Sequence, residues 1–289
     1  MIEASVIIGT LNQKDILKRT LESLFSQTCP ADKYELVLVD SRSSDGTEEM
    51  VKSLKPPCQM NYFRQENKGK VNARNNALRK ALGAIILFTD ADIPVEKNWI
   101  EEHIKAHQKY KNTAFAGQTI RLRREDLTDT ELPTKYKAFQ KIPWSYFMTG
   151  NLSISRDLIL KAGLFDENFK EYGWEDIELG YRLHKMGIPL RFLSSTLNHH
   201  IHPVSEKDFL NIMYKMGKSA AIFYKKHPNL QIKLYLGMNP LAMGLHSLIK
   251  KNKWLFNYIE KKAQGSKFFR YLLEQYYYLN GLKEVLASA

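Results

Sequence analysis

Short apolar runs alternate with amphipathic segments along the first third of the chain. Ala4–Gly9 and Tyr34–Asp40 are runs of apolar and β-branched residues, which favour buried strands. Between them, Leu17, Leu21 and Leu24 recur at the spacing of one helix face. The same pattern predicts a helix over Thr47–Leu54, a strand over Gln59–Arg64, a helix over Lys70–Leu82 and a strand over Ala84–Thr89. Strands that alternate with helices in this way predict an α/β fold with a doubly wound, mainly parallel sheet.

The regular alternation of predicted strands and helices ends after residue 113. We expect a strand over Ala114–Leu122, a helix over Gly173–Gly187 and a strand over Pro189–Leu193. The last third has helical character over Lys207–Lys226 and Lys250–Tyr278, with basic and aromatic residues mixed. The sequence therefore predicts a sheet domain followed by a helical extension.

We set the domain boundary at residues 1–204, divided into halves 1–112 and 113–204, and assign 205–289 to the helical extension. The chain has 289 residues and a net charge of +12. From 205 to 289 there are 14 Lys and Arg against 5 Asp and Glu, whereas the remainder has 29 against 26. A cationic third suits an anionic partner, either a membrane surface or a polyanionic substrate. No nucleic-acid-binding motif accompanies the charge, so we expect no nucleic acid partner. A basic helix can also simply pack its apolar face on the sheet domain, and the sequence leaves both readings open.

The sequence contains no secretory or membrane-spanning signal. The N-terminus reads as a strand, and no run of about 18 apolar residues occurs. Cys29 and Cys58 are too few for a disulfide framework or a cysteine zinc site. We expect a cytoplasmic protein, or one held peripherally on the cytoplasmic face of a membrane.

Two aspartates, Asp90 and Asp92, close the apolar run that begins at Gly83. Alternate residues of a strand point to the same face, so both carboxylates can face one cation. Carboxylate oxygens suit Mg²⁺ or Mn²⁺, which commonly hold substrate phosphates. A solvated turn after a strand is the alternative for an isolated pair of this kind.

Other polar residues fall at the ends of predicted parallel strands. Gly9 and Thr10 end the first strand, Asn12 is the predicted N-cap of the next helix, and Asp40 ends the second strand. Ligands bind at the carboxyl ends of strands in doubly wound sheets. Because these residues recur at one edge with Asp90 and Asp92, we interpret the edge as a binding site.

Six short motifs follow one another in a fixed order over residues 1 to about 204. They are Ser5–Asn12, Val39–Thr47, Asn67–Asn75, Thr89–Asp92, Gly150–Asn151 and Trp174–Asp176. Together these motifs resemble the family 2 glycosyltransferases, which have the GT-A fold. Two positions depart from the family pattern: Gly9 stands where proline is common, and Ser41 where a second aspartate is common.

The resemblance implies a nucleotide-sugar donor in the half 1–112. Asp40 is expected to accept a hydrogen bond from a uracil N–H, Arg74 to reach the nucleotide or pyrophosphate, and Asp92 to bind the metal directly. Asp90 is expected nearer the ribose, or to share the ion. The donor-binding residues implied are Gly9, Thr10, Asn12, Asp40, Asn67, Gly69, Arg74 and Asp90. For Asp40 a turn, and for Arg74 a solvated helix face, are the plainer explanations of each residue alone.

Acceptor chemistry is expected in the half 113–204. The resemblance implies Asp176 as the base that takes the acceptor proton, with Glu175 binding the acceptor or assisting. A helix N-terminus stabilises a carboxylate, but it also attracts acids for capping alone. Trp174 is expected to stack on a sugar ring, unless it is a core residue. Gly150 and Asn151 complete the implied acceptor-binding set.

Histidines cluster after the last predicted strand of the domain. The segment Asn198–Pro203 contains three, and an imidazole can complete a metal site. His202 and His199 are the candidate metal ligands beside Asp92 and Asp90.

These observations predict an inverting, Mg²⁺- or Mn²⁺-dependent glycosyltransferase that uses a UDP-sugar, with a growing glycan or lipid-linked saccharide as acceptor. The transferred group is expected to be a hexosyl or N-acetylhexosaminyl residue. A nucleotidyltransferase is one alternative, although Gly9–Asn12 is not a glycine- and lysine-rich phosphate loop. A catalytically inactive scaffold that binds glycan or membrane is the other.

Overall fold

The computed structural model describes residues 1–124, 127–130, 136–200 and 206–288. The chain divides into two compact units. The sheet unit comprises Met1–Glu167 and Asp176–Pro203, and the helical unit comprises Asn168–Glu175 and Val204–Ala289. Within the described ranges, every helix is too short or too polar to cross a membrane.

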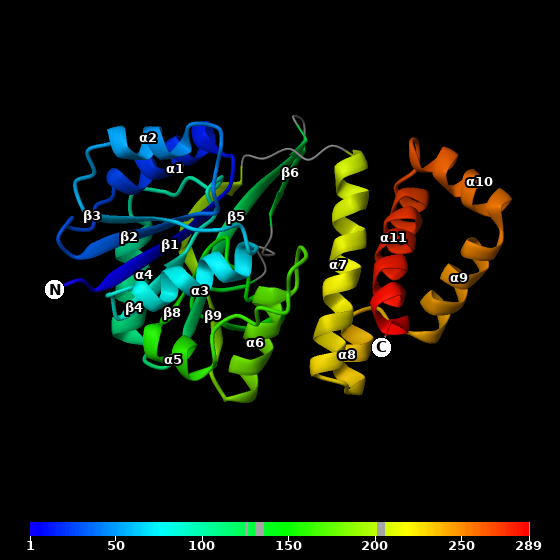
Figure 1. Cartoon of the computed structure of the whole chain (residues 1–289). Helices are drawn as coiled ribbons and strands as arrows, with labels where there is room; N and C mark the ends of the chain where they lie inside the picture. The colour runs from blue at the N-terminus through cyan, green and yellow to red at the C-terminus, as the bar shows by residue number, and fades with distance from the viewer. Residues whose placement is uncertain (125–126, 131–135, 201–205, 289) are drawn as a thin grey trace. The chain divides into compact units, whose positions relative to one another are not determined.

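The N-terminal part of the sheet unit is parallel, as the apolar runs predicted (Figure 1). Strand β1 pairs with β2 on one side and with β4 on the other, and β3 adds to β2. The carboxyl ends of these strands therefore meet at one edge. The elements are β1 (Ala4–Thr10), α1 (Lys14–Phe25), β2 (Tyr34–Asp40), α2 (Thr47–Ser53), β3 (Gln59–Arg64), α3 (Lys70–Lys80) and β4 (Ile85–Phe88).

The second part of the sheet unit continues the same sheet with mixed polarity. The strand order is β3-β2-β1-β4-β8-β5-β9-β7, with β6 paired to β5. Strand β8 is antiparallel to both β4 and β5, whereas β5 and β9 are parallel. The sheet is thus mainly parallel, which confirms the expected fold class. Its elements are α4 (Trp99–Lys109), β5 (Ala114–Arg124), β6 (Leu127–Thr130), β7 (Lys141–Ile142), a 3₁₀ turn (Trp144–Tyr146), β8 (Leu152–Ser155), α5 (Arg156–Lys161), α6 (Glu175–Lys185) and β9 (Leu190–His200).

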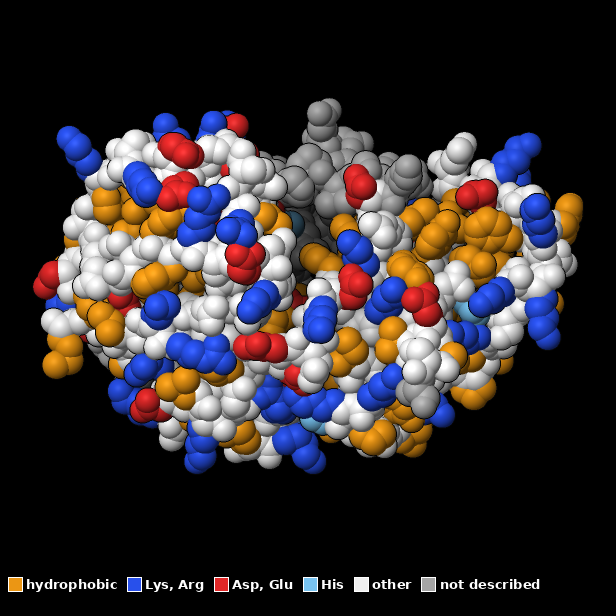
Figure 2. Space-filling view, in the orientation of Figure 1, with side chains coloured by type: hydrophobic (Ala, Val, Ile, Leu, Met, Phe, Trp, Pro, Cys, Tyr) orange, Lys and Arg blue, Asp and Glu red, His pale blue; other side chains and the backbone are white. Residues whose placement is uncertain are grey.

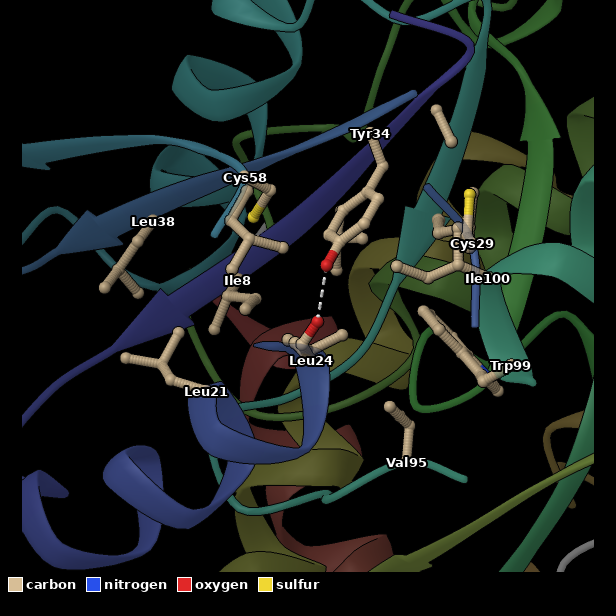
Figure 3. Packing of buried hydrophobic residues seen from close by; sticks show 14 of the residues in the cluster. Ile8, Leu21, Leu24, Cys29, Tyr34, Leu38, Cys58, Val95, Trp99 and Ile100 are labelled. Atoms are coloured by element: carbon tan, nitrogen blue, oxygen red, sulfur yellow. Dashed lines mark hydrogen bonds between the residues drawn. The ribbon is translucent and has the colours of Figure 1, made fainter. Parts of the chain in front are cut away.

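The main core lies between the sheet and helices α1, α2 and α4 (Figure 3). Leu21 and Leu24 of α1 pack there against Ile8 of β1, as the helical spacing of the leucines predicted. The Tyr34 hydroxyl donates to the Leu24 carbonyl at 2.8 Å, which joins β2 to the end of α1. On the other face of β1, a Cβ at Gly9 would lie in ordinary contact with α3. Helices therefore cover both faces of the sheet.

Three sequence predictions of local structure were wrong. Asn12 does not cap α1; the Asp45 carboxylate, distant in sequence, accepts the Lys14 N–H at 2.9 Å instead. The strand predicted to end at Leu193 continues to His200, because pairing with β5 extends it through its polar half. Lys250–Tyr278 is not one helix, since the Asn252 side chain accepts the Leu255 N–H and starts a new helix there.

The helical unit is built on two long helices that run side by side, α7 (Glu206–Lys226) and α11 (Lys267–Ala287) (Figure 1). Two glycines allow their close approach: a Cβ at Gly217 would overlap the Tyr278 carbonyl oxygen, and one at Gly281 would overlap that of Tyr214. Between the long helices in sequence lie α8 (Leu230–Tyr235), α9 (Pro240–Lys251) and α10 (Lys253–Ala263).

Candidate active site

The first part of the candidate site is the loop edge after β1 and β2. Thr10 and Asp40 are register partners at the ends of these strands. The Asn12 backbone N–H donates to the Ser43 hydroxyl at 2.9 Å, and Asn12 Oδ1 accepts the Ser44 N–H at 2.8 Å. Thr10 is buried, and among the described residues its hydroxyl has no hydrogen-bond partner. Hydrogen bonds therefore join the loop after β1 to the loop after β2, and the buried Thr10 hydroxyl remains able to bond to a ligand.

Asp40 lies beneath this edge rather than on it. Its carboxylate is fully buried, and Oδ1 accepts from both the backbone N–H and the hydroxyl of Ser43, at 2.8 and 2.7 Å. Oδ2 accepts from the Tyr62 hydroxyl at 2.7 Å. Burial, together with the hydrogen bond to Asp40, raises the pKa of Tyr62, so Tyr62 remains a donor. A carboxylate oxygen accepts two hydrogen bonds, so Oδ2 keeps one further acceptor position.

Helix α3 brings two cations to Asp90. Lys70 Nζ lies 3.0 Å from Asp90 Oδ2, and the buried Arg74 guanidinium lies 2.9 Å from Oδ1. Burial alone would raise the pKa of the Asp90 carboxyl, but the two cations outweigh it and hold that pKa well below its usual range. Sequence reasoning named Arg74 but missed Lys70, which stands one turn earlier on the same helix face.

The turn that begins α3 holds the two remaining donor-side predictions. The Gly69 N–H donates to Asn67 Oδ1 at 3.2 Å, and Gly69 has φ +91°, a conformation that favours glycine. Both residues are therefore used to shape the turn that presents Lys70.

Asp92 is buried and faces β9. His200 Nε2 lies 3.0 Å from Asp92 Oδ2, whereas His199 Nε2 lies 3.5 Å from Glu96 Oε1. Neighbouring residues of a strand point to opposite faces, so only one of these two histidines can meet Asp92. His202, the other predicted ligand, lies outside the described residues. Recognising the strand through this segment would have placed His199 and His200 on opposite faces, but only the structure shows that His200 is the one beside Asp92.

Asp92 and His200 fit a divalent cation as a partial protein site. One carboxylate oxygen and one imidazole nitrogen converge, and both are ligand types that Mn²⁺ accepts. No set of three or more His, Cys, Asp or Glu side chains suited to a metal occurs within the described ranges. Mg²⁺ and related ions in nucleotide sites are typically held by one or two protein ligands plus waters and substrate phosphates. The donor set therefore fits a metal that is completed by a phosphate ligand.

The region around Asp176 lies at the start of α6. Asp176 Oδ2 accepts the Thr149 N–H at 3.3 Å, and Oδ1 accepts the Ile177 N–H at 2.8 Å. These backbone donors and the helix N-terminus both favour the ionised carboxylate. Glu175 beside it is buried. Asp176 is thus a fixed carboxylate in the first turn of α6.

Trp174 belongs to the helical unit, where its ring packs among aromatic side chains. The ring centroids of Tyr235, Phe223 and Tyr278 lie 5.7, 6.4 and 6.4 Å from that of Trp174. Its φ is +71°, an uncommon conformation for a bulky residue and a strained one. Its contacts are therefore those of a packed residue whose backbone is held by its surroundings.

Asn151 is buried, and its amide is fully engaged inside the sheet unit. Its Oδ1 lies 2.8 Å from Trp99 Nε1 and 3.2 Å from His103 Nε2. Its Nδ2 donates to the Gln118 carbonyl at 2.9 Å and to the Thr196 carbonyl at 3.3 Å. The neighbouring Gly150 carbonyl accepts from Asn198 Nδ2 at 2.6 Å. This pair joins β8 to α4, β5 and β9.

Comparisons with known proteins agree with this fold. The sequence matches the model described as glycosyl transferase family 2 over residues 5–161. The uncharacterised glycosyltransferase YfnE of Bacillus subtilis is 30% identical over 277 residues, covering 75% of this chain and 70% of that protein. The mannosyltransferase PcManGT of Pyrobaculum calidifontis, solved with GDP-Man and Mn²⁺, has a TM-score of 0.68 at 19% identity, covering 99% of this chain and 87% of its own.

A second solved structure shares the fold at similar coverage. S. aureus TarS 1-349, in complex with UDP-GlcNAc, has a TM-score of 0.64 at 16% identity, covering 99% of this chain and 91% of its own. At these identities both structures establish the GT-A fold alone. Because the family model spans more than half of the 289 residues, and YfnE agrees with it, the protein belongs to glycosyl transferase family 2.

Proposed function

We propose that the protein is an inverting glycosyltransferase that moves a sugar from a UDP-sugar to a hydroxyl of a growing glycan or lipid-linked saccharide. One observation carries the proposal: at the carboxyl edge of the sheet, Asp92 meets His200 while Asp90 is paired with Lys70 and Arg74. A metal-ligand pair beside two cationic side chains at one edge of the sheet suits a diphosphate.

The donor side has two functions to serve, holding the diphosphate and recognising the base. Asp92 and His200 would hold Mn²⁺ or Mg²⁺, which when bound neutralises charge on the leaving diphosphate. Lys70 and Arg74 would bind the phosphate oxygens, aided by the N-terminus of α3, where backbone N–H groups and the helix dipole favour an anion.

Base recognition would rest on Asp40. Its Oδ2 accepts one hydrogen bond, from Tyr62, and a uracil N–H would supply the second. Because Asp40 is buried under Ser43, contact with a base requires the loop that carries Ser43 to shift.

The acceptor side would use Asp176 as base. Its carboxylate takes the proton of the acceptor hydroxyl while that oxygen bonds to the anomeric carbon from the face opposite the leaving group. The bond from the anomeric carbon to the diphosphate breaks, giving the inverted glycoside and the nucleoside diphosphate. The Thr149 and Ile177 N–H groups hold the carboxylate in place during this step.

The donor is tested by a thermal-shift screen of UDP-, GDP- and other nucleotide sugars with Mn²⁺. The true donor should raise the melting temperature, because a ligand that binds only the folded state stabilises it by mass action. A response to GDP-sugars alone would refute the UDP assignment, and release of pyrophosphate from a substrate would point to a nucleotidyltransferase.

The base is tested by Asp176→Asn. This variant should keep the donor-induced shift in melting temperature and lose transfer by about 10²–10⁴-fold, the usual contribution of a general base. Asp157→Asn is the matched control, since Asp157 also lies in the first turn of a helix of the same unit, on an exposed position. Wild-type turnover in Asp176→Asn would remove Asp176 as the base.

A further inference from the structure

A continuous row of aromatic rings lies on the surface where α10 turns into α11. Trp254 stacks on Tyr258 with ring centroids 5.7 Å apart, and Tyr258 meets Phe269 edge to face at 5.6 Å. Phe268 lies 5.4 Å from Phe269. Trp254 is 72% exposed and Phe268 is 63% exposed. We call Trp254, Tyr258, Phe269 and Phe268 the aromatic ridge.

Trp254, Tyr258 and Phe268 are exposed and lie apart from the packed face of α10, whereas Phe269 is partly buried and also packs against the core of the helical unit. Ile259 and Ala263 point into the core of the helical unit and are buried. Trp254 and Tyr258 are four residues apart, and Lys261 follows Tyr258 by three, so these three side chains share the opposite, outer face. The inner face of α10 already has its partners, and the outer face presents aromatic rings and a lysine to solvent.

Positive charge surrounds the ridge. Between 250 and 270 the chain has seven Lys and Arg and a single acidic residue, Glu260. Its six lysines are exposed, and among the described residues none of them pairs with a carboxylate; they are Lys250, Lys251, Lys253, Lys261, Lys262 and Lys267. Figure 2 shows hydrophobic side chains gathered over part of the helical unit, with Lys and Arg at the margin. Like charges without counter-charges favour an anionic partner.

We propose that the aromatic ridge and its lysines dock the protein on an anionic lipid surface. Tryptophan, tyrosine and phenylalanine rings insert at the level of the lipid headgroups, while lysines beside them reach the anionic headgroups. A second copy of the same face would bring the same positive charge and be repelled. This docking stands independently of the proposed glycosyl transfer, although a lipid-linked acceptor would benefit from it.

The test is co-sedimentation of the full chain with vesicles of phosphatidylcholine alone, or with phosphatidylglycerol added. Binding should require the anionic lipid and weaken as salt rises, because salt screens charges at the surface. Lys253→Gln, Lys261→Gln and Lys262→Gln together should weaken binding about a hundredfold, since each basic side chain near a lipid surface contributes about fivefold.

Matched controls separate the ridge from general charge and apolar surface. Lys55→Gln, Lys97→Gln and Lys111→Gln remove three exposed lysines from the sheet unit and should leave vesicle binding unchanged. Trp254→Ser with Phe268→Ser should weaken binding. Leu230→Ser, on the exposed face of α8, should not.

Several results would overturn the proposal. The first is equal binding to neutral and anionic vesicles, and the second is an equal loss of vesicle binding in the two triple-lysine variants. The third is competition by single-stranded RNA that removes the protein from anionic vesicles, which would show that the protein prefers RNA to anionic lipid. Self-association through the ridge, seen by sedimentation and lost in Trp254→Ser, would identify a second copy as the occupant instead. Donor-induced thermal shifts without vesicles should be the same in all these variants, so a failure of docking leaves the donor assignment intact.

Discussion

Acidification from about pH 8 to about pH 5 should destabilise the sheet unit. Over this range two histidines bind a proton in the unfolded chain but stay neutral while they are buried in the folded chain, so acid favours unfolding. His103 and His107 of α4 meet at Ser153 of β8: His103 Nδ1 lies 2.7 Å and His107 Nε2 lies 2.9 Å from the Ser153 hydroxyl. Since Asn151 Oδ1 is an acceptor, His103 Nε2 carries the proton and Nδ1 accepts from Ser153. A second proton on His103 would face the Ser153 hydroxyl and break this chain.

The size of the effect follows from the two pKa values. Burial lowers the pKa of His103 from 6.5 to about 3, with a further decrease from His107. Burial lowers the pKa of His107 from 6.5 to about 4, with Lys111 adding to it. Both folded pKa values lie below the unfolded value, so this stability is fully present above pH 6.5 and is lost as the pH falls below it. At about 1.4 kcal/mol per pH unit, each histidine accounts for about 2 kcal/mol by about pH 5.

The assay is guanidinium denaturation followed by tryptophan fluorescence at a series of pH values. Trp99 reports on this region, because its ring lies 5.0 Å from that of His103. The loss between pH 6.5 and 5 should be about halved in His103→Gln and unchanged in His184→Gln, whose histidine is exposed. The carboxyl of Asp90 titrates well below this window, so it does not contribute there. A wild-type pH slope in His103→Gln would refute the reasoning.

Two further predictions concern the metal ligand and the helix pair. Asp92→Ala should abolish the Mn²⁺-dependent part of donor binding and lower turnover on the order of 10²–10³-fold. Turnover is measured by the release of nucleoside diphosphate. Full activity of the wild-type protein in excess EDTA would contradict a metal role. Gly217→Ala should destabilise the helical unit by about 1–3 kcal/mol in thermal or denaturant unfolding, because its Cβ would overlap the Tyr278 carbonyl. Gly244→Ala, with open space around its Cβ, should be neutral or stabilising by up to about 1 kcal/mol, and equal losses in the two variants would disprove the packing argument.

Local patterns predicted the N-terminal part of the sheet because β1, β2 and β4 consist largely of apolar residues. The strand predicted over Tyr34–Asp40 has the bounds of β2, and Gln59–Arg64 those of β3. Where tertiary contacts decide, the patterns failed. The polar end of β9 is extended only by pairing with β5, and a loop residue, Asp45, caps α1 from outside the local sequence.

The sequence was enough to predict at which edge of the sheet the candidate site lies, but not which side chains contact one another there. Parallel pairing was enough to bring Thr10 and Asp40 together at one edge, as the strand order implied. The partners Lys70 and His200 were missed, since each meets its aspartate across a long sequence separation. Trp174 read as a sugar-stacking residue from its motif, whereas its ring contacts are with the aromatic side chains of the helical unit.

The two aspartates of the Asp90–Asp92 segment differ because the strand stops before them. Strand β4 ends at Phe88, and the Ile93 N–H donates to the Asp90 carbonyl at 3.2 Å, which makes the segment a turn. The Thr20 hydroxyl of α1 donates to the Ala91 carbonyl at 2.8 Å, which holds this turn against α1. Alternation along a strand therefore does not govern the two carboxylates, contrary to the expectation from spacing. A turn directs Asp90 to the cations of α3 and Asp92 to the histidine of β9. The carboxylate already neutralised by two cations has less charge to offer a metal, which leaves Asp92 as the stronger ligand of the pair.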